Sequence, residues 1–332
     1  TRATAYTSAL EIPAGKSLVL DLKEHTLVYS TDVQNRAMIH NNGDLTIKST
    51  TGAVKYTYTG ANDTTYGVGN YAINNAGTLT IESNVEAIAG TVGQKFSHAF
   101  YAINTSGELI VNSGKILNNT NIAIRQWVGS ESKTSAITVN GGEIEGLRGI
   151  WVQLPNSNTN LAPKGKITVT GGTITGTAID GTMDSENILA IYSYSYGNQM
   201  KNVEIEISGG TFNGDIALTG GRSGAKVDVE KITITGGVFN GLWGDVYSYA
   251  EDALAKDAIT IKGGEFSSIA PLVYLNAADE VVKLGKDIEN AEPIVFKGEG
   301  TLDLNGKTIS GIDAETKSYG LINIDPTAKL TI

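Results

Sequence analysis

Short runs of alternating apolar and polar residues recur along the chain, and each is followed by glycine. The run "KITVTGGTITGT" (166–177) returns as "VEIEISGGTFNGD" (203–215), "KITITGGVFNGL" (231–242) and "DAITIKGGEFSS" (257–268). Alternation with a period of two is typical of β-strands that bury one face. These segments predict short strands separated by tight turns, in which glycine adopts conformations that a Cβ atom would penalise.

Pairs of apolar residues mark one strand in each repeating unit. The second members of successive pairs lie 27 to 38 residues apart, a period that indicates a solenoid or a propeller. The pairs, which we expect to point inward, are Leu45/Ile47, Leu79/Ile81, Leu109/Val111, Ile137/Val139, Ile167/Val169, Ile205/Ile207, Ile232/Ile234 and Ile259/Ile261.

Each unit contains two further strands. One carries a large apolar residue five positions after the pair, and the other is a run such as "YAINN" (71–75), "YAINT" (101–105) or "LAIYS" (189–193). Corresponding strands repeat the same residue types, which favours stacking of like strands over the hairpins of a propeller blade. We therefore predict an all-β parallel β-solenoid of nine to ten triangular, three-strand coils with essentially no helix. A short helical turn is expected only within "SYAEDALAK" (248–256).

The repeats resemble a known class of proteins. "ITVTGGTITG" (167–176) and "LDLNGKTISG" (302–311) are similar to the right-handed parallel β-helix of the pectate-lyase-like superfamily, and more narrowly to adhesin-like and uncharacterised bacterial surface proteins. The resemblance covers nearly the whole chain and implies the fold and its right-handed winding. It is weak for function, because the superfamily includes polysaccharide lyases, galacturonases, phage tailspikes and non-catalytic adhesins.

A longer repeat relates the two ends of the chain. The segment 17–47 resembles 300–332, with Asp21 matching Asp303, Thr26 matching Thr308 and Ile47 matching Ile332. One interpretation is a module spanning 1–292 followed by the start of a second tandem module, 293–332. The alternative is a single β-helix over 1–332 whose end coils share a geometry. In either case we expect the natural protein to be longer, because the chain ends on a strand-like run without a polar cap.

Composition narrows the function classes. The net charge is −10, which argues against nucleic acid and anionic membrane surfaces as partners. The chain has no cysteine, so thiol catalysis and cysteine-based metal sites are excluded. Its three histidines (His25, His40 and His98) all lie in the first third, and no apolar run is long enough to span a bilayer.

Insertions and aromatic residues gather on one side of the predicted coils. The gap between the third strand and the next coil is 6 residues in the first coils and 13 to 17 in the later ones. Residues that follow the inward positions Ile150, Ile191, Val246 and Val273 should point outward. We therefore predict a ligand-binding aromatic strip for a glycan or a protein surface, composed of Trp127, Trp151, Tyr192, Tyr194, Tyr247, Tyr249 and Tyr274. The equally weighted alternative is that the insertion loops cover these rings.

Catalysis is a weaker interpretation. Asp215 and Asp245 precede inward residues in adjacent coils and would form an outward pair of carboxylates, as glycoside hydrolysis requires. Solvated edge charges that discourage stacking errors are the simpler explanation. Lyases of the resembled fold use Ca²⁺-binding acids with a basic residue, but Arg125, Arg148 and Arg222 lack partners at a recognisable spacing.

Acidic residues in one loop are candidate Ca²⁺ ligands, and several asparagines are candidates for a structural role. Asp180, Asp184 and Glu186 could supply oxygen ligands to Ca²⁺, although ordinary loop acids are the simpler explanation, and we predict no cofactor and no resident metal. Asn118, Asn213 and Asn240 are expected to form a partial ladder of side-chain hydrogen bonds between coils.

Together these patterns favour a non-catalytic, adhesin-like β-helix, extracellular or on a bacterial cell surface. Its expected partners are a polysaccharide, a glycoconjugate or a host or partner surface protein, without nucleic acid and without membrane insertion. A polysaccharide-active lyase or glycoside hydrolase and a purely structural stalk remain the alternatives.

Overall fold

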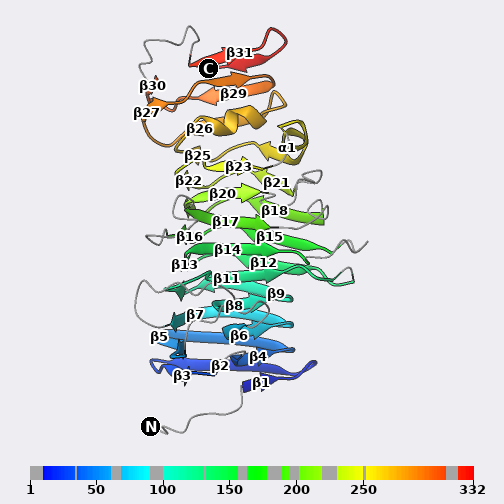
Figure 1. Ribbon diagram of the computed structural model, residues 1–332, viewed down its shortest axis with the longest axis vertical. Coiled ribbons are helices and arrows are strands. Elements are labelled where there is room, and N and C mark those ends of the chain that lie inside the picture. The colour runs from blue at the N-terminus through cyan, green and yellow to red at the C-terminus, as the bar shows by residue number, and fades with distance from the viewer. Residues whose placement is uncertain are drawn as a thin grey trace.

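The structure is a computed structural model, and it describes residues 10–33, 36–60, 69–89, 100–130, 132–155, 163–177, 188–194, 202–218, 230–249, 252–311 and 321–332. Within these ranges the chain winds upward in successive turns from the N-terminus to the C-terminus (Figure 1). Every strand pairing in them is parallel. The fold is therefore a parallel β-solenoid, as predicted, with about eight turns rather than nine to ten.

One face of the solenoid is a nine-stranded sheet built from the third strand of each unit. Its strands, in spatial order, are β1 (Leu10–Ile12), β4 (Ala37–Asn41), β6 (Asn70–Asn75), β8 (Phe100–Thr105), β11 (Ile124–Trp127), β14 (Arg148–Gln153), β17 (Leu189–Tyr194), β20 (Asp215–Leu218) and β23 (Val246–Ser248).

The remaining strands form a larger sheet and two small pairs. The larger sheet contains β2 (Ser17–Lys23), β3 (Leu27–Thr31), β5 (Asp44–Tyr58), β7 (Thr78–Ala89), β9 (Glu108–Ser113), β10 (Lys115–Asn118), β12 (Ser135–Val139), β13 (Glu143–Gly146), β15 (Gly165–Val169), β16 (Thr173–Gly176), β18 (Val203–Ile207), β19 (Thr211–Asn213), β21 (Lys231–Ile234), β22 (Val238–Asn240), β24 (Ile259–Ile261), β25 (Glu265–Phe266), β26 (Val281–Leu284), β29 (Glu299–Asp303) and β32 (Lys329–Thr331). The pairs are β27 (Ile288–Ala291) with β30 (Ile309–Gly311), and β28 (Ile294–Phe296) with β31 (Ile322–Ile324).

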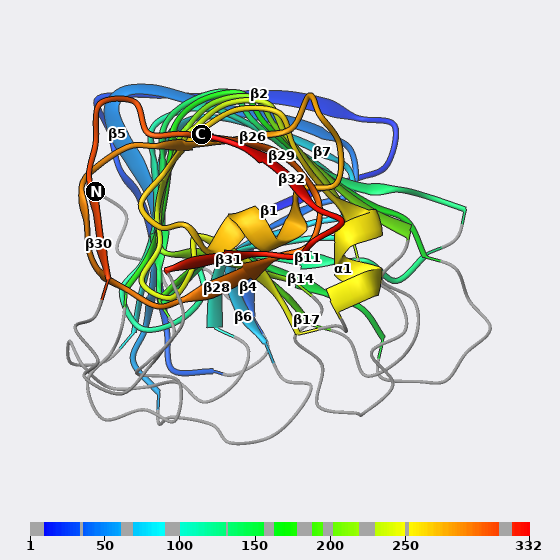
Figure 2. The same ribbon diagram turned by 90° about the horizontal axis from the view of Figure 1, so that it is seen from above.

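Two short helical elements lie wholly within the described ranges, beside a single 3₁₀ residue at Asn202. The α-helix α1 (Asp252–Ala258) overlaps the segment in which the sequence predicted a helical turn. The 3₁₀-helix η2 (Ala270–Tyr274) replaces a strand that the pattern would otherwise continue. Seen along the solenoid axis, the strands surround the interior and α1 lies beside them (Figure 2).

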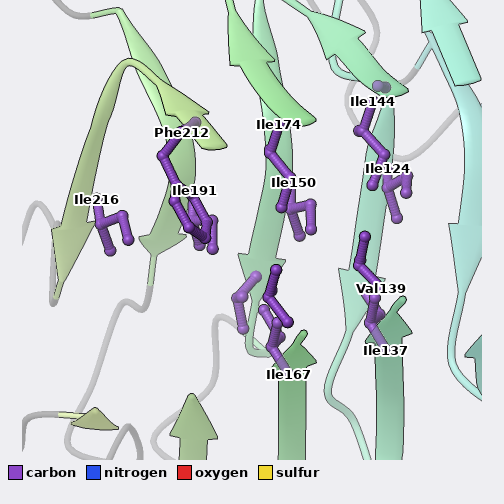
Figure 3. Packing of buried hydrophobic residues seen from close by; sticks show 14 of the residues in the cluster. Ile124, Ile137, Val139, Ile144, Ile150, Ile167, Ile174, Ile191, Phe212 and Ile216 are labelled. Carbon is purple, nitrogen blue, oxygen red and sulfur yellow. The ribbon is translucent and has the colours of Figure 1, made fainter. Parts of the chain in front are cut away.

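Like side chains stack directly above one another in the interior. Ile124, Ile150, Ile191 and Ile216 are in register on the nine-stranded sheet and are fully buried (Figure 3). The inward pairs that the sequence predicted are all buried too. On the larger sheet, Ile144 and Ile174 begin a second inward row. The rings of Phe212, Phe239 and Phe266 continue this row, with ring centroids 4.9 and 4.7 Å apart. Each coil thus buries its apolar side chains only because its neighbours cover them.

Glycine is required where adjacent coils approach at the corner of the larger sheet. Gly172 has a φ of +80°, and a Cβ atom on it would lie 2.8 Å from the carbonyl oxygen of Gly142. Both the left-handed backbone and the close neighbour exclude a larger side chain there. This explains the repeated Gly-Gly pairs of the sequence.

The asparagine ladder forms only in part. Asn240 donates its side-chain amide to Asn213 Oδ1 at 3.2 Å, and Asn213 donates to Thr175 at 3.3 Å, so these residues link coils as predicted. Asn118 does not join them. It is buried, and it bonds the backbone of its own loop and of Phe100 instead.

The similarity of the two ends extends to their secondary structure. The strands β2, β3, β4 and the start of β5 follow one another in the first turn as β29, β30, β31 and β32 do in the last. A tandem module starting at residue 293 stays a prediction.

Candidate functional site

Trp151, Tyr192 and Tyr247 lie in one row on the outward side of the nine-stranded sheet. Each follows a fully buried residue, and alternate side chains of a strand face opposite ways. Trp151 is in register with Tyr192, which pairs with Ala217, which in turn pairs with Tyr247. The predicted strip therefore exists as a row, but Ala217 interrupts it between the two tyrosines.

The same row becomes polar toward the N-terminus. Arg125 is the register partner of Trp151, and below it the row continues through Asn104 and Asn74 to His40. Asn104 donates its side-chain amide to Asn74 Oδ1 at 2.8 Å. The outward row thus passes from amides through one guanidinium to aromatic rings.

Arg125 lies among three aromatic rings. Its guanidinium carbon is 4.6 Å from the ring centre of Trp127, 5.6 Å from that of Tyr101 and 5.9 Å from that of Trp151. Cation–π attraction is strongest over tryptophan and increases where solvent is partly excluded. Arg125, Trp127 and Trp151 are each half-buried. We refer to Arg125 and these three rings as the Arg125 cluster.

Two amide side chains orient the guanidinium of Arg125. Its Nε donates a hydrogen bond to Gln153 Oε1 at 2.7 Å, and one terminal nitrogen donates to Asn104 Oδ1 at 3.0 Å. These acceptors sit on the strands on either side of β11. Because amides carry no charge, they fix the direction of the guanidinium without neutralising it.

Tyr101 and Tyr71 lie on this side of the sheet, although the sequence analysis did not assign them to it, and Tyr101 is only 4% exposed. Their rings stack with centroids 5.8 Å apart, and Tyr101 meets Trp151 edge to face at 6.1 Å. Burial raises the pKa of Tyr71 above its ordinary value. The repeated "YAIN" runs gave no signal for this, because strict alternation would place each tyrosine on the same face as the inward isoleucine two positions later. Alternation does not hold there, since Ala72 and Ile73 are both fully buried.

A second cation contacts the row one coil further on. The guanidinium of Arg148 lies 4.3 Å from the ring centre of Tyr192. Near the far end, Tyr247 and Tyr249 meet edge to face at 5.4 Å. Burial, together with the neighbouring Tyr249, raises the pKa of Tyr247. The backbone of Tyr194 is the register partner of Gln153, and its side chain lies outside the described part of the structure.

The placement of Tyr274 on the outward strip was wrong. Tyr274 is only 8% exposed and ends the 3₁₀-helix η2, while Val273, expected inward, is half-buried. The hydroxyl of Tyr274 accepts a hydrogen bond from the backbone N–H of Ser248 at 3.1 Å. The cause is Pro271, which lacks a backbone donor and occupies the first turn of η2, so the period-two alternation does not apply.

The outward placement of Asp215 and Asp245 was also wrong, because both side chains are 0% exposed. Asp215 accepts hydrogen bonds from the backbone N–H groups of residues 242 to 245, at 2.8 to 3.3 Å. Asp245 adopts a φ of +64° and accepts from Gly241 N, Ser267 Oγ and Ser268 N. Burial raises the pKa of Asp245. The two carboxylates hold a turn together and do not face a ligand.

That turn carries two exposed apolar side chains. Leu242 is 63% and Trp243 is 60% exposed, while the backbone beneath them is bonded to Asp215. Trp243 lies in the turn between β22 and β23 rather than on the strand row.

Other candidate sites offer little chemistry. A shallow groove follows the glycine corner, where Lys283 and Glu265 form an ion pair at 2.7 Å. No group of three or more metal-ligating side chains occurs within the described ranges. The calcium candidates Asp180, Asp184 and Glu186 lie outside those ranges. Among the described helices, none is long and apolar enough to cross a membrane.

Comparisons of the chain with protein-family models, with curated protein sequences and with solved structures each returned no match.

Proposed function

We propose that this chain is a non-catalytic, adhesin-like β-helix that binds glycans through its outward aromatic row. The observation that carries the proposal is the register pairing of Trp151 with Tyr192, beside the Arg125 cluster. Flat rings with polar edges suit the apolar faces of sugars, and amides such as Gln153 and Asn104 suit their hydroxyl groups. A rigid solenoid would hold these groups at fixed spacings along a polymer.

The wider setting is part of the same proposal. We infer a secreted or surface-displayed bacterial protein of the pectate-lyase-like superfamily, with a polysaccharide, a glycoconjugate or a host surface as its partner. The sequence resemblance and the acidic net charge of −10 support this setting. Neither the lyase nor the hydrolase alternative gains support from Asp215 and Asp245, because backbone donors surround both carboxylates.

A glycan array tests the proposal. Wild-type protein and the double variant Trp151→Ala/Tyr192→Ala are compared on the same array, with Val238→Ala as a control that removes an exposed side chain from the other sheet. We expect wild-type and control proteins to retain a common set of glycans that the double variant loses. Equal retention by all three proteins would reject the row as the binding site. If wild-type protein retains no glycan, while an assay for unsaturated or reducing sugar products is also negative, the stalk alternative holds.

A further inference from the structure

Arg125 keeps most of its hydrogen-bonding capacity unused within the protein. An arginine side chain has five N–H donors. Two of them donate to Gln153 and Asn104. The remaining contacts of the guanidinium are with the faces of aromatic rings. Within the described ranges, three of the five donors therefore have no protein acceptor.

The charge of Arg125 also has no ion-pair partner among the described residues. No carboxylate in the described part of the chain forms an ion pair with it, although eight lysine–carboxylate pairs form elsewhere on the same solenoid. Its neighbours along the outward row are an amide on one side and an indole on the other. In a chain with 35 acidic and 25 basic residues, the half-buried Arg125 thus differs from the paired lysines, because it forms no ion pair within the described ranges.

The side chains around Arg125 fix the orientation of its guanidinium. Amide oxygens on the two flanking strands set its direction, and the Trp127 ring covers one side. Because these contacts exist before any ligand arrives, little side-chain entropy remains to be lost on binding. Arginine presents paired donors whose geometry matches a planar carboxylate better than a single-point donor would.

We propose that Arg125 binds the carboxylate of an acidic sugar, either a hexuronate or a sialic acid, while the rings of Trp127 and Trp151 contact sugar faces. This inference rests on the proposed function, and it assigns the ligand class at the same site. The neutral amides and aromatic rings around the cation fit a ligand that carries one negative group on a largely uncharged, hydroxylated ring. Asn104 and Gln153 are positioned to retain the guanidinium orientation on binding.

Matched acidic and neutral probes test the assignment. The probes are 3′-sialyllactose with lactose, and a glucuronate oligosaccharide with its carboxyl-reduced form, each titrated calorimetrically into the full chain. We expect at least one acidic probe to bind about tenfold or more tightly than its neutral partner. Arg125→Gln should remove that preference, so that the acidic and neutral partners of a pair bind with similar affinity. Arg36→Gln, at an exposed arginine before β4, should keep the preference.

The variant Arg125→Lys protects the test against misfolding. It keeps the charge but lacks the paired donors, so we expect it to fold and to lose most of the acidic preference. Equal affinity for acidic and neutral probes would overturn the inference while leaving glycan binding intact. An acidic preference that survives in Arg125→Gln would place the carboxylate elsewhere and also overturn it. If no glycan binds, on the array or in solution, the proposed function fails together with this inference. Preference for the sialylated or the glucuronate probe alone identifies the source of the carboxylate.

Discussion

The guanidinium of Arg125 lies 4.6 Å from the ring centre of Trp127, two residues further along the same strand. Residues two apart on a strand share a face, so the contact follows directly from the local geometry of β11. The register then adds Trp151 from β14 and Tyr101 from β8. Three consecutive coils thus supply a single cluster.

The phenylalanine ladder should be a main source of stability. Phe239 is stacked between Phe212 and Phe266 and is fully buried. Phe239→Ala leaves a cavity that neighbouring coils can fill only in part, so we expect a loss of about 3–5 kcal/mol in the free energy of unfolding. Urea denaturation measures this loss, and Val238→Ala at the exposed neighbouring position should cost far less. Similar costs at both positions would contradict the inward stacking.

Asp215 should determine the order of the turn that carries Leu242 and Trp243. Asp215→Asn replaces an oxygen acceptor with an N–H₂ group beside the backbone donors of residues 242 to 245. We expect a loss of about 2 kcal/mol or more in the free energy of unfolding, with faster amide hydrogen exchange in this turn. Asp257→Asn, at an exposed position on α1, is the control. Unchanged exchange at residues 242 to 245 would show that the carboxylate does not hold the turn.

The buried carboxyl of Asp245 should make the free energy of unfolding depend on pH. Burial raises its pKa in the folded state, so the folded protein binds the proton more tightly than the unfolded chain does. Its contribution to stability is therefore present at low pH and is lost as the pH rises through the folded-state pKa. The free energy of unfolding of wild type minus that of Asp245→Asn should therefore be larger near pH 4 than at pH 7. If this difference increased with rising pH, burial could not be raising the pKa of Asp245 in the folded protein.

Two glycines separate the cost of backbone conformation from that of close approach. Gly172 and Gly306 have similar φ angles of +80° and +70°, but a Cβ on Gly306 would meet nothing within 4 Å. We expect Gly306→Ala to cost about 1 kcal/mol from backbone strain alone. Gly172→Ala should cost clearly more, because its Cβ would contact Gly142 and Gly141 of the adjacent coil. Thermal unfolding of the two variants provides the comparison, and equal costs would mean that the coils can separate locally.

The fold could be predicted well from the sequence because individual apolar residues mark the inward positions of each repeat. Inward positions such as Ile150 and Ile191 follow from period-two alternation, and register follows from the stacking of like strands. The same rule placed Trp151 and Tyr192 outward. It was wrong at Tyr274, where Pro271 starts a 3₁₀-helix, and at Asp215, whose burial depends on backbone donors one coil later. Such non-local hydrogen bonds leave no periodic signal in the sequence.

The Arg125 cluster was predictable only in part for a related reason. Its rings could be assigned to a face from alternation, but the convergence of Arg125 with Tyr101 and Trp151 depends on the relative register of β8, β11 and β14. The insertions between coils change length there, so the sequence spacing alone does not fix which residues become neighbours.

The most direct test of a sugar-binding aromatic row uses the tryptophans themselves. The chain has three, and Trp243→Phe leaves only Trp127 and Trp151, both of which contact Arg125. Their fluorescence in this variant is followed while a glycan retained on the array is titrated in. A saturable change in intensity or emission maximum, at the same midpoint as binding measured by calorimetry, is the predicted result. Calorimetric binding of that glycan with unchanged fluorescence would show that it binds elsewhere and would contradict the proposed site.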